Sequence, residues 1–177
     1  MANRYLMAVD AGTGSVRAVL FNEDGAQLSC VQREWTHAED PRYPGSMDFD
    51  WVHNWELASE CIRGAIAQAG VDAGDIAAVS TTCMREGIVL YDEAGQEIWA
   101  CANVDARSDD EVGQLIRMNP ELEKEIYRES GQTYALGALP RILWVKNKLP
   151  ELYVRVKTVS MFNDWLIYKL TGVLKTE

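Results

Sequence analysis

Residues 10–15, Asp-Ala-Gly-Thr-Gly-Ser, place a carboxylate, two glycines and two hydroxyls between two apolar runs. A tight turn between strands directs several backbone N–H groups into one concavity, which suits the oxygens of a phosphate group. Gly12 and Gly14 allow a ligand to approach closely and permit positive φ angles, while Thr13 and Ser15 add hydroxyl donors. The stretch is therefore a candidate phosphate-binding turn.

Two charged residues flank this turn. Arg17 could supply a fixed positive charge, and Asp10 at the strand end could hold Mg²⁺ directly or through water. The stretch is neither of the common phosphate loops, because it lacks GxxxxGK[ST] and has no GxGxxG that opens a helix. Taken alone, it is also compatible with a plain hairpin, in which Gly and Asp are frequent for conformational reasons.

Arg85 and Glu86 follow another apolar run, at the end of a predicted strand. Charged residues in that position can project into a cleft beside an open sheet. Arg donates hydrogen bonds to hydroxyl or carbonyl oxygens and Glu accepts them from hydroxyls, so the pair suits a polyol. The alternative is a solvated turn with a surface ion pair.

A third set of polar residues alternates along the chain, namely Asn103, Asp105 and Arg107. These side chains could face one side of an extended segment and meet a ligand. The same pattern is equally compatible with a helix entry, in which Arg107 and Ser108 lead into the next helix.

The composition is that of a globular chain with a substantial core. Of 177 residues, 47% are hydrophobic and 25% are charged. The formal net charge of −10 argues against nucleic-acid and acidic-membrane partners, because phosphate backbones require clustered Lys and Arg. No stretch approaches the roughly 20 apolar residues that a membrane helix needs. The four cysteines lack metal-site spacing, which favours reduced thiols and a cytoplasmic protein.

Local patterns predict an α/β chain whose first part is a three-stranded antiparallel meander followed by a helix. The predicted strands of the meander are residues 5–10, 15–21 and 26–35. The helix is predicted over 51–69, with Asp50 as its N-cap and Gly70 as its stop. Residues 75–83 predict a mostly buried strand that pairs in parallel, and residues 87–100 predict a hairpin.

The second half of the chain is predicted to be mainly helical. Ser108 and Glu111 have the spacing of a capping box. Asn119 and Pro120 predict the start of a further helix, which Gly131 ends. The remaining predicted elements are a helix from Pro140 to Lys148, a strand over 158–162, and a helix capped by Asn163 or Asp164 and ended by Gly172.

Four motifs in this order resemble the FGGY family of carbohydrate kinases. "DAGTGSVRAV" resembles the family's phosphate-binding hairpin, and "PGSMDFDWVHNW" resembles the segment before its first long helix. "MREGIVLYD" resembles its Arg-Glu substrate element, and "MFNDWLIYKLTG" a late segment of its first domain. The resemblance covers essentially the whole chain and implies an actin-like, ribonuclease-H-like ATPase fold, an α/β domain with a mixed sheet and an N-terminal antiparallel meander.

The resemblance also implies ATP and Mg²⁺ as cofactors and a small linear polyol or carbonyl substrate, such as a five-carbon dihydroxy-dione. The implied phosphate-binding residues are Gly12, Thr13, Gly14, Ser15 and Arg17, and the implied metal ligand is Asp10. The implied substrate-binding residues are Arg85, Glu86, Asn103 and Asp105. Many family members have Trp where this chain has Asn103, which predicts a substrate unlike an ordinary pentulose or glycerol.

The family's general base is an Asp in a Gly-Gly-x-Asp element, and this sequence contains no such element. We therefore expect no catalytic residue in this chain and a general base beyond Glu177. Residues 1–177 are accordingly expected to be the N-terminal part of the first domain, incomplete and inactive alone, without the rest of that domain and the second domain.

An incomplete domain could also associate with itself, and two other functions are compatible with the sequence. A core face left uncovered would favour self-association. Two other functions stay open: a related kinase of a ketopentose or a sugar acid, and a non-catalytic actin-like module that binds a sugar or a partner.

Overall fold

The structure is a computed structural model that describes residues 4–176. Glu177, beyond which the general base is expected, lies outside the described residues. The described residues form two compact units. The first, unit 1, contains residues 4–36, 50–84 and 162–176, and the second, unit 2, contains residues 37–49 and 85–161.

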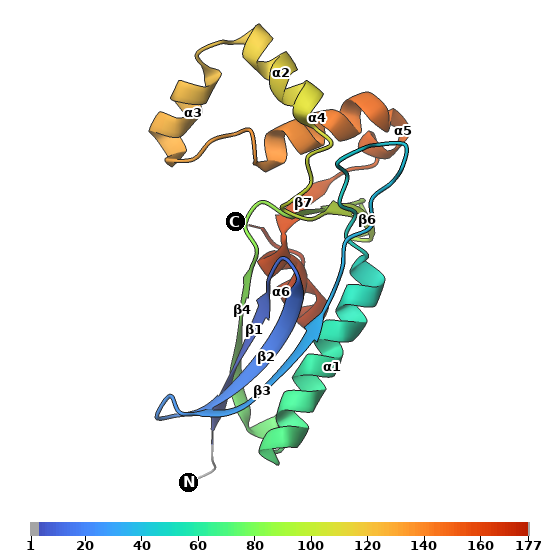
Figure 1. The fold of residues 1–177 in the computed structure, drawn as a ribbon. Helices are drawn as coiled ribbons and strands as arrows, with labels where there is room; N and C mark the ends of the chain where they lie inside the picture. Colours follow the sequence, from blue (N-terminus) through green and yellow to red (C-terminus); the bar gives the residue numbers. More distant parts are fainter. Residues whose placement is uncertain (1–3, 177) are drawn as a thin grey trace. The chain divides into compact units, whose positions relative to one another are not determined.

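Unit 1 is built on a four-stranded mixed sheet with the strand order β3-β2-β1-β4 (Figure 1). Its strands are β1 (Tyr5–Ala11), β2 (Ser15–Asn22), β3 (Gln27–Glu34) and β4 (Ile76–Cys83). The first three pair antiparallel, which confirms the predicted meander, and β4 pairs in parallel with β1.

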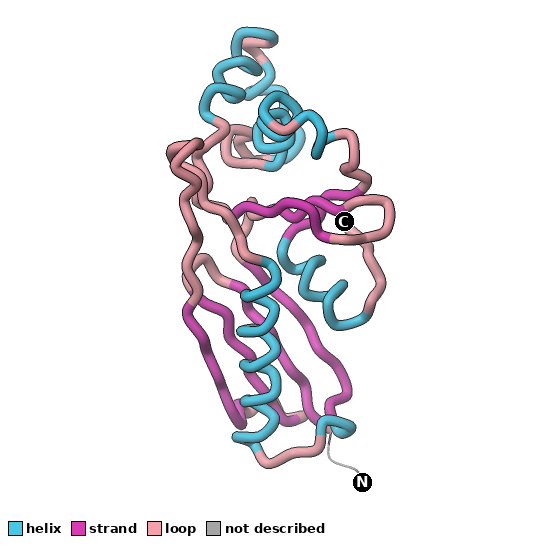
Figure 2. Tube along the Cα trace, turned by 90° about the vertical axis from the view of Figure 1, so that its right-hand side faces the viewer, coloured by secondary structure: helices cyan, strands magenta, loops and turns pink. Residues whose placement is uncertain are grey.

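Two helices, α1 (Trp51–Ala69) and α6 (Phe162–Thr171), pack against this sheet. The long helix α1 runs beside the strands in Figure 2. It begins where the Asp50 carboxylate accepts hydrogen bonds from two backbone N–H groups, and it ends at Gly70, which has a φ of 66°. Both predicted ends of this helix are confirmed.

The alternation of side chains along β1 and β2 separates a buried face of the sheet from a more open one. Val9 and Leu20 are fully buried on the first face. Asp10 and Arg17 are opposite each other in the strand register, and because strand side chains alternate, both project from the other face. The turn residues and their charged neighbours are thus fixed to the end of a packed sheet.

Two predictions for unit 1 are wrong in part. Residues 75–83 do not form a mostly buried strand, since β4 is largely exposed as the edge strand of the sheet among the described residues. Helix α6 begins at Phe162, directly after a strand, so Asn163 and Asp164 lie inside its first turn and neither is its N-cap. Gly172, with a φ of 71°, follows the helix as predicted.

Unit 2 has a three-stranded antiparallel sheet with the order β6-β5-β7. Its strands are β5 (Ile88–Tyr91), β6 (Glu97–Cys101) and β7 (Thr158–Met161). Its helices are α2 (Asp109–Met118), α3 (Leu122–Ser130), α4 (Ala138–Lys148) and α5 (Pro150–Tyr153). The hairpin predicted over 87–100 is formed by β5 and β6.

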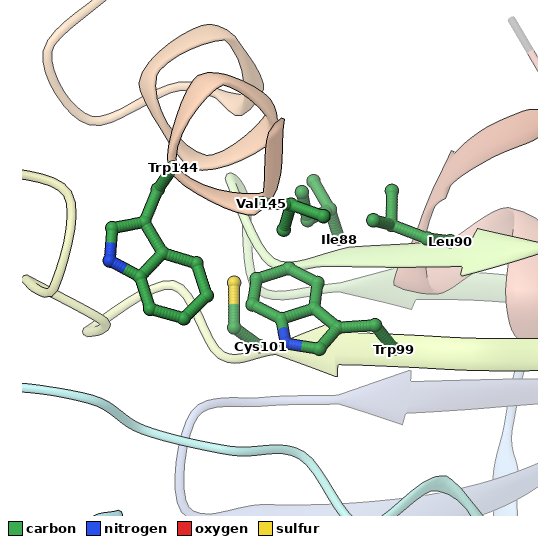
Figure 3. Packing of buried hydrophobic residues seen from close by; sticks show 6 residues of the cluster. All are labelled: Ile88, Leu90, Trp99, Cys101, Trp144 and Val145. Atoms are coloured by element: carbon green, nitrogen blue, oxygen red, sulfur yellow. The ribbon is translucent and has the colours of Figure 1, made fainter. Parts of the chain in front are cut away.

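The core of unit 2 lies between α4 and this sheet. Figure 3 shows Trp144 and Val145 extending from α4 toward side chains of β5 and β6. The four strand residues of this cluster are Ile88, Leu90, Trp99 and Cys101. Helix α4 is therefore anchored by apolar packing to the strands that follow Glu86 and precede Asn103.

The predicted helices of unit 2 exist, but three details of their starts differ. Ser108 occupies the N-cap position of α2 without a side-chain capping bond, so no capping box forms. Helix α3 starts at Leu122 with Glu121 as N-cap, after Asn119 has accepted a hydrogen bond from the Glu121 N–H (3.1 Å). Helix α4 starts two residues before Pro140. Between residues 4 and 176, no helix has the length and apolar character needed to cross a membrane.

Candidate functional site

Trp35 holds the turn between β1 and β2 from one side. Its indole Nε1 donates to the carbonyl oxygens of Gly12 (3.0 Å) and Thr13 (3.1 Å). Its backbone N–H donates to the carbonyl oxygen of Gly14 at 3.1 Å. Because Trp35 is itself buried, three successive carbonyls of the turn are fixed toward the interior of unit 1.

The N–H groups of the same three peptide units point the opposite way. In a planar trans peptide the N–H is antiparallel to the C=O, and the described residues contain no cis peptide bond. The N–H groups of Thr13, Gly14 and Ser15 are therefore directed away from the Trp35 donors. Thr13 and Gly14 are exposed, and a Cβ added at Gly14 would meet no atom within 4 Å. The N–H groups of this exposed turn thus face away from Trp35, the arrangement that an anion-binding turn would use.

From the sequence, Gly12 and Gly14 permit both close approach and positive φ. Neither Gly12 nor Gly14 is among the described residues with a positive φ, so the turn does not use the left-handed backbone that these glycines permit. At Gly12 an added Cβ would lie 3.4 Å from the Ser15 carbonyl oxygen, so the glycine avoids a close contact inside the turn.

Asp10 and Arg17 form an ion pair beside the turn. Asp10 Oδ2 accepts hydrogen bonds from Arg17 Nε (2.9 Å) and Nη2 (2.7 Å). The side chain of Arg17 is 51% exposed and that of Asp10 is 28% exposed, so both groups can be reached by a ligand. Within residues 4–176, no cluster of three or more His, Cys, Asp or Glu side chains could hold a metal. A cation at Asp10 would therefore rely on this carboxylate together with water and phosphate oxygens, a mode that suits Mg²⁺.

Glu86 has an unusual backbone conformation. It is the one non-glycine residue with a positive φ (69°) among those the structure describes. Such a conformation costs about 1–3 kcal/mol and is typical of functional sites. Its Oε2 atom lies beside Gly137, where an added Cβ would be 3.4 Å away. Gly137 is the N-cap of α4, so the carboxylate lies near the positive end of a helix dipole, and the neighbouring Arg85 is exposed.

Asp105 is engaged within unit 2. Its side chain is fully buried and forms an ion pair with Arg107, whose Nη2 lies 2.6 Å from Asp105 Oδ2. The same oxygen accepts a hydrogen bond from the backbone N–H of Met47 at 2.7 Å. Arg107 also pairs with Asp48. Asp105 thus links separate segments of unit 2 through its own side chain, while Asn103 is half-buried on the same segment.

The surroundings of Arg107 explain how this charge is tolerated in a core. Its guanidinium carbon lies 5.3 Å from the ring centre of Trp99 and 5.0 Å from that of Trp144. Burial lowers the pKa of Arg107, but the hydrogen bonds to Asp105 and Asp48 outweigh it and raise that pKa. Nearby, burial raises the pKa of the Cys101 thiol to about 12, so this thiol is neutral.

The structure places the predicted residues in two groups. Asp10, Arg17 and the turn residues belong to unit 1, whereas the four predicted substrate residues, Arg85, Glu86, Asn103 and Asp105, belong to unit 2. Sequence reasoning missed two residues that organise these groups. Trp35 binds the turn carbonyls, and Arg141 of α4 donates to the backbone carbonyl oxygens of the substrate group, those of Glu86, Asn103 and Asp105. A tryptophan after a strand and an arginine in a helix have no local signal for these roles, because their partners are distant in sequence.

Comparisons with known proteins identify the family to which the chain belongs. The model of the FGGY family of carbohydrate kinases, N-terminal domain, matches residues 5–177. The chain belongs to the FGGY family. It is 51% identical over 177 residues to an autoinducer-2 kinase of Salmonella typhimurium, covering 99% of this chain and 33% of that protein. An autoinducer-2 kinase of Escherichia coli is 51% identical over 174 residues, covering 98% of this chain and 33% of that protein. This FGGY chain thus spans about a third of those relatives.

Solved structures confirm the actin-like fold of this FGGY chain. The gluconate kinase of Lactobacillus acidophilus superposes with a TM-score of 0.84 at 20% identity, covering 97% of this chain and 34% of that one. The xylulose kinase of the same organism superposes with a TM-score of 0.83 at 21% identity, again over 97% and 34%. The stretches "CMREGIVLY" and "IWACANVDAR" point to the autoinducer-2 kinases within the family, and the 51% identity confirms this closeness.

Proposed function

We propose that residues 1–177 are the N-terminal part of the first domain of an ATP-dependent kinase that phosphorylates a hydroxyl group of a small linear substrate. The observation that supports this most directly is the turn at residues 12–14, whose carbonyls are bound by Trp35 and whose N–H groups face outward. The family membership supports phosphoryl transfer as the reaction.

The proposed substrate is dihydroxypentanedione, the precursor of autoinducer-2. The 51% identity to autoinducer-2 kinases supports it. Two features of unit 2 also fit: Glu86 can accept hydrogen bonds from hydroxyls, and the exposed Arg85 can donate to carbonyl oxygens. Asn103 would contribute a smaller, polar lining than the Trp of many relatives. We assign Asp105 a supporting place in this lining, since its side chain is engaged by Arg107 and Met47.

In this proposal, the residues of the chain act by positioning and by stabilising charge, which dominate phosphoryl transfer. The N–H groups of residues 13–15 and the Arg17 guanidinium hold phosphate oxygens. Asp10 has one carboxylate oxygen engaged by Arg17, which leaves the other for a metal or its bound water. Mg²⁺, when bound there, would neutralise phosphate charge. The general base is proposed to lie in the part of the kinase that follows Glu177, so no residue of this chain is assigned that role.

Two experiments test this proposal. In the full-length kinase, meaning residues 1–177 together with the remainder of both domains, Glu86→Ala should strongly raise the KM for the dione and leave the KM for ATP nearly unchanged. The matched control is Glu93→Ala, an exposed residue in the turn between β5 and β6. An equal loss for both substrates would remove Glu86 from its assigned role.

The second experiment uses the 177-residue chain alone. We expect no ATP-dependent phosphorylation of the dione above a buffer control, because the base and the second domain are supplied by the rest of the kinase. Turnover by the isolated chain would contradict the proposed domain assignment. Self-association of this chain through the exposed strand β4 is a further part of the proposal, and sedimentation at increasing concentration measures it.

A further inference from the structure

Arg141 in α4 is almost fully buried, with 2% of its surface exposed. All of its recorded hydrogen bonds go to backbone carbonyl oxygens. Nη1 donates to Leu136 (2.8 Å) and to Glu86, and Nη2 donates to Asn103 (2.8 Å) and Asp105 (3.2 Å). One guanidinium therefore ties together three separate segments of unit 2.

The charge of Arg141 makes these bonds energetically important. Among the described residues, no carboxylate lies within ion-pair distance of Arg141, and its Nε has no hydrogen-bond partner. A buried cation without a counter-ion is costly unless dipoles replace its hydration. The four carbonyl dipoles are this replacement, so the guanidinium and the segments that supply its acceptors must keep a fixed mutual geometry.

The acceptors include three of the four predicted substrate residues. Glu86 is bonded through its carbonyl, and its positive φ of 69° requires its surroundings to hold it in place. The carbonyls of Asn103 and Asp105 come from the other predicted substrate segment. Leu136 directly precedes Gly137, the helix N-cap beside which the Glu86 carboxylate lies. Arg141 thus fixes both the backbone of Glu86 and the surface against which its carboxylate lies.

We propose that Arg141 is a positioning residue for the small-molecule substrate: it sets the backbone of residues 86 and 103–105 and thereby the direction of the Glu86 carboxylate. This inference rests on the proposed kinase function. A lysine could not do the same, because its single Nζ cannot span two pairs of carbonyls as the planar fork of Arg does. The role belongs to the guanidinium shape and not merely to a positive charge.

The test compares Arg141→Lys and Arg141→Ala in the full-length kinase with Arg155→Ala, an exposed arginine of the same unit. The loss of a charged hydrogen bond of this kind corresponds to about a 10- to 100-fold change in a binding constant. We therefore expect both Arg141 variants to raise the KM for the dione by about this factor while the KM for ATP stays within about twofold. Arg155→Ala should change neither constant.

Chemical rescue provides a readout that a general loss of stability would not. Arg141→Ala leaves a cavity lined by four carbonyl acceptors, so millimolar guanidinium chloride should restore the KM for the dione, whereas sodium chloride or methylammonium chloride should not. Full restoration by Lys, equal changes in the two KM values, or a folded Ala variant that guanidinium does not rescue would each overturn the proposal.

Hydrogen exchange of backbone amides tests the positioning role of Arg141 without a measurement of activity. In the Arg141→Ala chain, the amides of residues 86–88 and 103–107 should exchange faster than in the wild type and slow again with guanidinium. If neither variant folds, the wild type provides the test. Its amides of residues 86–88 and 103–107 should exchange at the same rate as those of α4, and exchange at unrelated rates would overturn the proposal. If the wild-type kinase phosphorylates nothing, the proposed function fails, but the exchange result still decides whether Arg141 fixes these segments.

Discussion

Asp105→Asn separates a structural role of this residue from direct substrate binding. The Asp105 side chain is fully buried and that of Arg107 is 3% exposed, so the substitution leaves a buried guanidinium without its buried counter-ion. Breaking such a pair typically costs about 3–5 kcal/mol. Because Arg107 keeps its contact with Asp48, which is 45% exposed, we expect a value near the lower limit, about 3 kcal/mol.

The assay is urea unfolding of the 177-residue chain, monitored by tryptophan fluorescence, because Trp99 and Trp144 flank Arg107. The control is Glu121→Gln, which removes an exposed ion pair with Lys124 in the same unit and should cost less than about 1 kcal/mol. If Asp105→Asn is no more destabilising than Glu121→Gln, the account of Asp105 as a core ion pair is refuted. A stable Asp105→Asn kinase with a raised KM for the dione would instead show direct substrate contact.

Two further predictions concern Trp35 and Cys101. Trp35→Phe removes the indole donor that two turn carbonyls share, so it should lower the free energy of unfolding in urea by about 1–2 kcal/mol and raise the KM for ATP. Trp55→Phe is the control in the same unit. Identical results for the two variants would contradict the role of Trp35. For Cys101, the folded-state pKa of about 12 lies above that of an unfolded thiol, so the folded state retains the proton while the unfolded chain loses it. The contribution of Cys101 to the free energy of unfolding is present below about pH 8.5 and falls by up to about 1.4 kcal/mol per pH unit toward pH 12. Cys101→Ala should therefore reduce the slope of the free energy of unfolding against pH above about pH 8.5. An unchanged slope would contradict this contribution of Cys101.

Local signals in the sequence predicted the elements of both units well. Helix α1 starts after Asp50 and ends at Gly70 because capping and left-handed glycine are properties of a few adjacent residues. The meander and the hairpin follow in the same way from alternating apolar residues and turn residues. The family resemblance, based on four ordered motifs, correctly gave the actin-like fold.

What the sequence did not reveal depends on contacts between distant residues. The capping box at Ser108 and the burial of β4 both failed because spacing alone does not determine which groups a side chain meets. The contact of Trp35 with the turn spans more than 20 residues, and the contact of Arg141 with Glu86 spans 55. Asp105 was identified as a polar candidate, but its burial against Arg107 becomes visible only in the folded unit.

A substrate panel with the full-length kinase, ATP and Mg²⁺ tests the proposed dione kinase activity most directly. We expect phosphorylation of the dihydroxy-dione with a higher kcat/KM than that for xylulose, glycerol or gluconate. Much faster phosphorylation of xylulose or glycerol would contradict the assigned substrate and leave the family membership intact. If the folded protein binds a sugar but phosphorylates none of these compounds with ATP, the kinase assignment itself is contradicted.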